Sequence, residues 1–280
     1  MIQQNKVKSD ARAEHYRTGL PIKVTHGLLR YLLILTITST VSFADSNVDN
    51  PPLIGIQGID DRIIVNGSQA PWQAIGKVHT ADLFACTGVL ITAKHVLTAA
   101  HCIWNKKSNE LMPMEYIHFE TGHHRDIYLA ARGVKRVKLP AQYKLEQDQP
   151  INLGNLALDW AILELDTPIN NIRPIPLSPL SVKELIATGQ NTAVIQAGFS
   201  GDRQYILTAN KRCKIIKQYK KHPLVTHNCD ATNGDSGSPL LVKEKGDYHV
   251  IAMLVGVRSS PQRQSTGLAI TIPAIPFKKH

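Results

Sequence analysis

The chain has 280 residues, 43% of them hydrophobic and 6% aromatic, and a formal net charge of +10 at pH 7. This length and apolar content are enough to bury one large core or two smaller ones, which excludes wholesale disorder. Residues 1–30 carry six basic and two acidic residues, and the net charge of +6 that remains without them is too mild to indicate a nucleic-acid-binding protein.

The first 44 residues have the pattern of a secretory signal peptide. A basic stretch, residues 1–30, precedes the uncharged run YLLILTITSTVSFA at 31–44, and the small residues Ser42 and Ala44 indicate a cleavage site. The uncharged run is shorter than the roughly 20 residues that a membrane-spanning helix needs. We therefore expect residues 1–44 to be a signal peptide, removed to leave a secreted protein (extracellular or periplasmic) without stable membrane association. The alternative is an N-terminal membrane anchor.

The rest of the chain has the pattern of an all-β protein. Residues 45–62 are polar and contain Gly and Pro, which predicts a linker or propeptide. From residue 63 onward, short runs of Val, Ile and Thr are punctuated by Gly, Pro, Asn or Asp, as in a sandwich or barrel. Strand-like runs are similarly frequent in residues 63–170 and 171–280, so the domain at 63–280 has room for two barrels.

Two segments have more specific patterns. The basic run KRCKIIKQYKK at 211–221 alternates like a strand with one solvated face, and apart from Tyr219 it lacks the interleaved aromatic residues of a nucleic-acid patch. Residues 181–188, SVKELIAT, are long enough for two helical turns.

The four cysteines are Cys86, Cys102, Cys213 and Cys229. An even count in an exported chain predicts two disulfides, and of the three connectivities we favour the two that join sequence neighbours, 86–102 and 213–229. No C-x-x-C pair is present, which argues against a metal site built on cysteines.

Three histidines, His118, His123 and His124, lie close together in the stretch HFETGHHRD. A metal site is one interpretation, but we favour exposed loop histidines. We therefore expect no metal and no cofactor.

Three stretches place polar groups where the pattern predicts a core. They are LTAAHC with His101, LALDWAILEL with Asp159, and NCDATNGDSGSPLL with Ser236. Taken singly, each polar residue is explained by a structural role, as a core histidine, a turn aspartate and a turn serine. Taken together, they supply a nucleophile, the base that a weakly nucleophilic hydroxyl needs, and the third group that orients the base.

The stretches TAAHC, DWAIL and GDSGSP resemble the active-site signatures of trypsin-like serine proteases of the chymotrypsin fold. The serine in place of the second glycine of the usual GDSGGP, and the segment DDRIIVNGSQAPWQAIGKV, are similar to the bacterial V8-like branch. The resemblance covers residues 61–272. It implies two six-stranded antiparallel β-barrels with the active site in the cleft between them. It also implies a serine endopeptidase that hydrolyses proteins or peptides through an acyl-enzyme, and we expect it to be a monomer.

The resemblance also implies a role for each site residue. His101 is the general base and then the general acid, Asp159 orients it, and Ser236 attacks the scissile carbonyl. The backbone N–H groups of Gly234 and Ser236 form the oxyanion hole, and a β-carbon at position 234 would obstruct the sharp turn that presents them.

The disulfide pattern matches this resemblance in part. Cys86 and Cys102 match the family's disulfide beside the catalytic histidine. Cys229 stands seven residues before Ser236, whereas the family's usual cysteine stands four before it. The pair Cys213–Cys229 therefore resembles the bacterial pattern and is expected to brace the specificity loop.

The substrate-binding residues expected from the resemblance are Asp230, Gly256 and Gly267. Asp230 has the spacing to Ser236 of the aspartate at the floor of the trypsin pocket, and its carboxylate would select Arg or Lys. The competing interpretation is a structural aspartate. Glutamate specificity would need a polar wall, and the stretch AMLVGV at 252–257 lacks a histidine.

The sequence also allows more than one interpretation of how the chain is activated and of whether it is catalytic. Arg62–Ile63 is a candidate zymogen cleavage site, although one Ile more than usual precedes the VNG stretch. A non-catalytic protease homologue that binds proteins is the main alternative function, but all three triad residues are present. An esterase is disfavoured, because the chain lacks a G-x-S-x-G elbow at Ser236.

Overall fold

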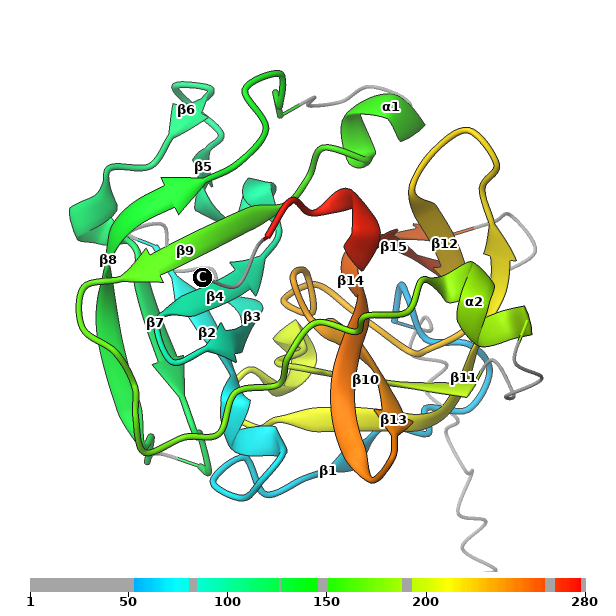
Figure 1. The fold of residues 1–280 in the computed structure, drawn as a ribbon, viewed down its shortest axis with the longest axis horizontal. Coiled ribbons are helices and arrows are strands. Elements are labelled where there is room, and N and C mark those ends of the chain that lie inside the picture. The colour runs from blue at the N-terminus through cyan, green and yellow to red at the C-terminus, as the bar shows by residue number, and fades with distance from the viewer. Residues whose placement is uncertain are drawn as a thin grey trace, which may run out of the picture. The chain divides into compact units, whose positions relative to one another are not determined.

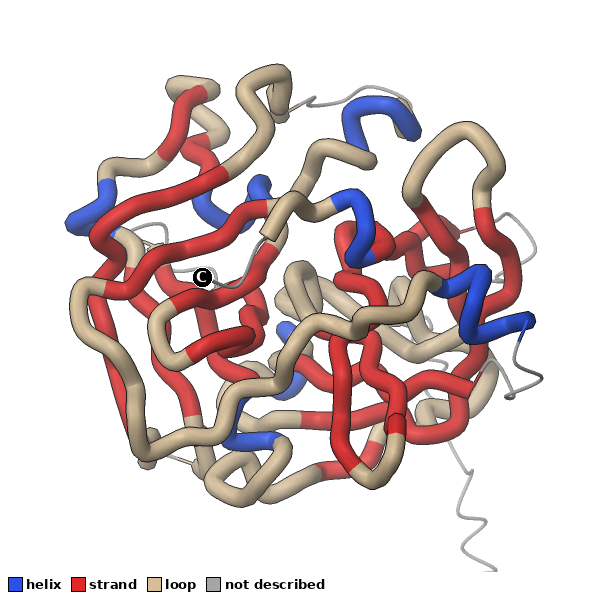
Figure 2. The backbone as a smooth tube through the Cα atoms, in the orientation of Figure 1, coloured by secondary structure: helices blue, strands red, loops and turns tan. Residues whose placement is uncertain are grey.

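The computed structural model describes residues 53–80, 85–125, 127–145, 151–187, 193–259 and 265–277. The chain divides into two compact units, Met1–Asp49 and Asn50–His280, and only the second contains described residues. The expected signal peptide at 1–44 lies outside the described residues. The regular structure of the described part is mostly strand, with a few short helices and long connecting loops (Figure 2).

Six antiparallel strands close into the first barrel, in the order β2-β3-β4-β9-β8-β7. The strands are β2 (Ile75–His79), β3 (Cys86–Thr92), β4 (His95–Thr98), β7 (His118–Thr121), β8 (Ala130–Lys138) and β9 (Ala161–Leu165). Its core contains Val89, Leu97, Phe119 and Leu163, all fully buried. A separate small hairpin joins β5 (Trp104–Asn105) to β6 (Glu110–Leu111).

The second barrel follows in the sequence and is also antiparallel (Figure 1). Its strands run in the order β11-β10-β13-β14-β15-β12, and the pairing of β11 with β12 closes the ring. The strands are β10 (Ala193–Gly198), β11 (Thr208–Gln218), β12 (Leu224–His227), β13 (Pro239–Glu244), β14 (Asp247–Ser259) and β15 (Ser265–Thr271). The expectation of two six-stranded antiparallel barrels is therefore confirmed.

One strand pairs with a different barrel from the one that its position in the sequence suggests. β1 (Ile63–Ile64) precedes the first barrel in the chain, yet it pairs with Thr208 and Ala209 of β11, in the second. The start of the domain is thus attached to the second barrel.

The helices are short. They are α1 (Leu153–Leu156), α2 (Val182–Ala187), and the 3-10 helices η1 (Trp72–Ala74), η2 (Ala100–Ile103), η3 (Met114–Tyr116), η4 (Gly201–Arg203) and η5 (Ile272–Ala274). The helix expected within 181–188 is confirmed as α2. Among the described helices, none combines the length and the hydrophobicity that crossing a membrane requires.

Local sequence explains two of these elements. In β11, Cys213 and Ile215 are buried while Lys214 and Ile216 face solvent, which is the alternation that 211–221 predicts. The hairpin between β13 and β14 turns through Lys245 and Gly246, whose φ angles are +51° and +96°. A two-residue turn of this hand suits the twist of the strands.

Candidate active site

His101 and Asp159 form a close pair on the first barrel. His101 lies in η2, just after β4, and Asp159 lies just before β9, the strand that pairs with β4. The imidazole Nδ1 is 2.6 Å from Asp159 Oδ2, and the backbone N–H of His101 donates to Oδ1 at 2.8 Å. Burial alone would lower the pKa of His101, but the adjacent carboxylate outweighs it and raises the pKa above its usual value.

Tyr143 is a further partner of Asp159 that the sequence does not indicate. Its side chain is 4% exposed, its ring packs edge-on against Trp104 at 5.1 Å, and it lies close enough to Asp159 for the carboxylate to shift its pKa. Burial first, and then the carboxylate, raise the pKa of Tyr143, so the hydroxyl stays protonated. No local pattern predicts this contact, because the two residues stand 16 positions apart in the sequence.

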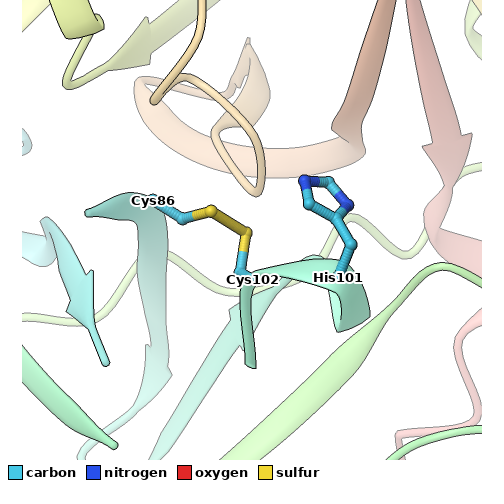
Figure 3. A group of neighbouring side chains, drawn as sticks. All are labelled: Cys86, His101 and Cys102. Carbon is cyan, nitrogen blue, oxygen red and sulfur yellow. A yellow bond between two sulfur atoms is a disulfide. The ribbon is translucent and has the colours of Figure 1, made fainter. Parts of the chain in front are cut away.

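The Cys86–Cys102 disulfide holds the helix that carries His101 against β3. Figure 3 shows Cys102 next to His101 on η2, with Cys86 at the start of β3. Both expected disulfides are present, 86–102 and 213–229, so the favoured connectivity is confirmed. The two sulfurs near His101 are bonded to each other and are not free to bind a metal.

The loop that carries Ser236 is attached to the same strand, β3. The Thr87 backbone N–H donates to the Ser236 carbonyl at 2.9 Å, and the Thr87 hydroxyl donates to the Gly234 carbonyl at 3.0 Å. Cys102 Sγ lies 3.7 Å from the Ser236 carbonyl oxygen. The structure thus brings the Ser236 loop beside η2, although the Ser236 hydroxyl makes no hydrogen bond to His101 or to another described residue.

Two glycines shape this loop. Gly234 and Gly237 have φ angles of +94° and +84°, a region that disfavours residues with a β-carbon. A β-carbon at Gly234 would lie 2.5 Å from the Phe199 carbonyl oxygen, and one at Gly237 would overlap the Thr87 carbonyl. Both positions therefore need glycine.

The backbone N–H groups of the Ser236 loop fall into two sets, those that donate to a carbonyl and those that do not. The N–H groups of Asp235, Gly237 and Ser238 donate to carbonyls at 3.2, 2.8 and 2.9 Å. The N–H groups of Gly234 and Ser236 donate to no described residue. Two amides on either side of one residue are thus left without an acceptor, as an oxyanion site requires.

Asp235 lies between Gly234 and Ser236 and is 1% exposed. Its Oδ2 accepts hydrogen bonds from the Thr232 N–H at 2.8 Å and the Ser200 hydroxyl at 2.7 Å. Burial raises the pKa of Asp235 to about 6 despite these donors. Gly198 makes room for it, since a β-carbon there would lie 2.5 Å from Asp235 Oδ1.

The serine that replaces the second glycine of the usual motif has a partner. Ser238 is fully buried, and its hydroxyl accepts a hydrogen bond from Gln196 Nε2 at 2.8 Å. The extra side chain is thus accommodated without an unsatisfied polar group.

This arrangement of two barrels with a histidine–aspartate pair beside a glycine-flanked serine matches a known family. A family model described as Trypsin matches residues 63–279. The chain belongs to the trypsin family.

Two of the sequence relatives come from animals. Vitamin K-dependent protein C from Mus musculus is 29% identical over 223 residues, which cover 69% of this chain and 46% of the relative. Proclotting enzyme from Tachypleus tridentatus is 24% identical over 235 residues, covering 73% and 62%. This trypsin-family chain therefore spans less than two thirds of the length of these relatives.

A solved structure titled as a Glu endopeptidase in complex with MPD has the same fold. It aligns with a TM-score of 0.60 at 19% identity and covers 79% of this chain and 95% of that one.

Asp230, the expected specificity residue, already has partners. Its side chain is 2% exposed, and its oxygens accept backbone hydrogen bonds from Gln57 at 2.7 Å and Asp61 at 3.3 Å. Burial raises the pKa of Asp230, while these two bonds oppose the shift. In this structure the Asp230 carboxylate is therefore already hydrogen-bonded to backbone amides of the segment that precedes the protease domain.

The segment that supplies these amides also covers the neighbouring residues. The Ala231 N–H donates to the Gly55 carbonyl at 3.1 Å, and the Gly55 N–H donates to Ser265 Oγ at 3.3 Å. A β-carbon at Gly55 would overlap the Ala231 carbonyl and contact Val257. The segment before the protease domain thus lies on the residues where the resemblance places the specificity pocket.

Gly256 and Gly267 lie on the adjacent strands β14 and β15. A β-carbon at Gly256 would meet nothing within 4 Å, whereas one at Gly267 would overlap the ring of His227. His227 comes from β12, is fully buried, and its Nε2 has no hydrogen-bond partner. The stretch 252–257 does lack a histidine, but a neighbouring strand provides one, which burial keeps neutral by lowering its pKa to about 3.

Arg62, at the candidate cleavage site, is held in an ion-pair network. Its side chain is 1% exposed, and its guanidinium bonds Asp60 at 2.9 Å and Asp202 at 2.8 and 3.0 Å. Burial alone would lower the pKa of Arg62, but these carboxylates raise it. The residue is a buried anchor in this structure.

Proposed function

We propose that this chain is a secreted serine endopeptidase, with Ser236 as the nucleophile, His101 as the general base and Asp159 as the residue that orients it. The observation that carries the proposal is the 2.6 Å contact between His101 and Asp159 on the barrel to which the Ser236 loop is attached. The trypsin-family match supports a hydrolase that acts on proteins or peptides.

The proposed reaction passes through an acyl-enzyme. Ser236 Oγ attacks the scissile carbonyl carbon while His101 Nε2 takes the hydroxyl proton, and Asp159 stabilises the imidazolium that forms. The N–H groups of Gly234 and Ser236 bind the negative oxygen of the tetrahedral intermediate. His101 then protonates the leaving amine as the C–N bond breaks. A water molecule, deprotonated by His101, hydrolyses the ester and restores Ser236.

We also propose the division of the chain that the sequence predicts. Residues 1–44 are the signal peptide, 45–62 a linker or propeptide, and 63–280 the protease domain, which acts as a monomer. Ser238 of the GDSGSP motif and the fold likeness to a Glu endopeptidase support the bacterial V8-like branch. The relatives from Mus musculus and Tachypleus tridentatus are animal proteins and do not support a bacterial branch.

For Asp230 we propose the structural role over the binding of Arg or Lys. Both carboxylate oxygens hold backbone amides of the segment 57–61, so a basic substrate side chain would first have to displace that segment. If the segment leaves, Asp230, Gly256 and Gly267 become the residues that contact the substrate.

The experiment that tests the proposal is labelling with a fluorophosphonate probe, followed by peptide mapping. We expect the probe on Ser236 alone, and Ser236→Ala or His101→Ala should lower turnover by about a millionfold while secretion and fold persist. The exposed Ser108 offers a matched control, since Ser108→Ala should label normally. Folded native protein that takes up no label would favour the non-catalytic homologue.

A further inference from the structure

Two histidines and a glutamate of the first barrel converge on one point, in a group separate from the His101–Asp159 pair. His79 ends β2, Glu120 lies in the neighbouring β7, and His123 follows β7 by two residues. His79 Nε2 is 3.0 Å from Glu120 Oε2, and His123 Nε2 is 3.2 Å from the same oxygen. The three ligand atoms all lie within 4.8 Å of one another. We infer that His79, Glu120 and His123 form a binding site for a divalent transition metal, with Zn²⁺ as the best chemical match.

The spacing of the three atoms suits a metal. In a tetrahedral site with bonds of about 2.0–2.2 Å, two ligand atoms are about 3.3 Å apart. The two measured separations, 3.0 and 3.2 Å, are close to that value. Small movements of the side chains would therefore place all three atoms around one ion, and the fourth position would be left to water.

The hydrogen bonding of the cluster is incomplete. His79 Nε2 is buried and, despite its 3.0 Å distance from the carboxylate, is not aligned for a hydrogen bond. His123 is 7% exposed, and its Nδ1 also has no hydrogen-bond partner among the described residues. Buried polar nitrogens without a partner are costly, and a metal ion at the point where the groups converge would satisfy His79 Nε2. The interpretation of His123 as an exposed loop residue is therefore wrong.

The protonation states of the two histidines also suit a metal site. Burial is the main cause that lowers the pKa of both His79 and His123, the latter to about 4, so both rings are neutral at neutral pH. Neutral imidazole is the form that binds metals. Two imidazoles and one carboxylate suit Zn²⁺ better than Ca²⁺ or Mg²⁺, which prefer oxygen ligands alone.

The positive charge of Lys77 opposes the binding of a metal ion at this cluster. It lies on the same face of β2 as His79, it pairs across the sheet with Glu120, and its charge contributes to the lowered pKa of His123. Its ammonium lies over the rings of Phe199 and Tyr205, at 5.2 and 5.1 Å, and burial lowers its own pKa. Removal of this charge should therefore strengthen metal binding, which gives the proposal a directional test.

The test is calorimetric titration of Zn²⁺ into the chelator-treated full chain, in a Ser236→Ala background that prevents self-digestion. We expect one Zn²⁺ per chain and a rise in Tm on binding. His79→Gln and Glu120→Gln should each weaken binding by about 100-fold or more, since even outer-shell changes cost about 10–100-fold. Lys77→Met should bind several-fold more tightly.

Exposed His124, next to His123, provides the matched control, because His124→Ala should bind Zn²⁺ as the parent does. Far-UV circular dichroism and Tm of the metal-free variants confirm that each one is folded. The proposal is overturned if the folded parent binds no Zn²⁺, if His79→Gln and Glu120→Gln bind as the parent does, or if His124→Ala abolishes binding. In that case the cluster is a hydrogen-bonded group without a metal.

Discussion

The Asp159 carboxylate is fixed by two contacts with His101 and lies beside the Tyr143 side chain. His101 approaches it twice, through its backbone N–H and its ring, and the proximity of the carboxylate helps to raise the pKa of Tyr143. A carboxylate with this many partners has one preferred orientation, and it sets both the position and the basicity of the imidazole. The proton-accepting strength of the site therefore depends on residues that never touch the substrate.

The pH dependence of activity should show this coupling. In the proposed mechanism His101 accepts the Ser236 proton only when it is neutral, and its pKa is raised by Asp159 against the opposing effect of burial. The acid limb of kcat/KM should thus lie above the usual histidine value of about 6.5, with activity lost as pH falls through it. Asp159→Asn should move the limb to lower pH and reduce kcat by about 10⁴-fold, measured from initial rates across the pH range.

Tyr143→Phe is the conservative comparison for this experiment. The variant keeps the ring that packs on Trp104 and removes only the hydroxyl, so we expect a loss of about tenfold in kcat/KM. An acid limb in Asp159→Asn that does not move would show that Asp159 does not set the basicity of His101.

Asp230 gives a second prediction at this scale. If its carboxylate anchors the segment 57–61, Asp230→Asn should speed amide hydrogen exchange at Gln57 and Asp61 by about tenfold or more, because a lost hydrogen bond to a charged group costs about 1.5–3 kcal/mol. A peptide-library cleavage profile of both forms provides the other measurement. Wild-type protein that cleaves after Arg and Lys, with that preference lost in Asp230→Asn, would restore the substrate-binding role.

At the scale of elements, the two disulfides form a natural comparison. Each closes a loop of 16 residues, one joining β3 to η2 and the other beginning in β11 and ending just before Asp230. Because each disulfide restricts the unfolded chain to a similar degree, each should stabilise the fold by about 3 kcal/mol. Their effects on the active site should differ, because only the first contains a neighbour of His101.

Replacement of each cysteine pair by alanine tests this difference. Both double variants should lose similar free energy of unfolding, measured by denaturant titration. The 86–102 variant should in addition lose about 10- to 100-fold in kcat/KM, because His101 and Ser236 are then less well aligned. Equal loss of activity in the two variants would mean that the first disulfide has no special part in positioning His101.

The sequence predicts elements well where a pattern is local. Alternation predicts β11, and the SVKELIAT stretch predicts α2. β1 is harder, because the strand is two residues long and its partner stands more than 140 residues away. The burial of His123 is also hidden from the sequence, because it depends on packing against Phe199 of the second barrel, at 5.5 Å between ring centres.

Across the unit Asn50–His280, the segment before the protease domain is bound to the second barrel. Gln57 reaches Asp230 across 173 positions and Arg62 reaches Asp202 across 140, so no local pattern could have predicted either contact. The stretches around His101, Asp159 and Ser236 stand out in the sequence because the chemistry proposed for them requires particular residue types and neighbours, whereas these anchors are ordinary polar residues. Further contacts of the same kind hold Arg62 and Ile63 at the candidate cleavage site.

The Arg62–Ile63 bond should resist cleavage in the folded protein. A protease acting after Arg62 would have to extract its buried guanidinium from Asp60 and Asp202 and separate β1 from β11. Added trypsin should therefore leave this bond intact in a full-chain Ser236→Ala protein, as followed by mass spectrometry of timed digests. Asp202→Asn removes one charged partner and should speed the cut. Asp247→Asn, which removes an exposed partner of Arg173, should not. Rapid cleavage of the parent at this bond, with a gain of activity when Ser236 is present, would instead establish activation by cleavage.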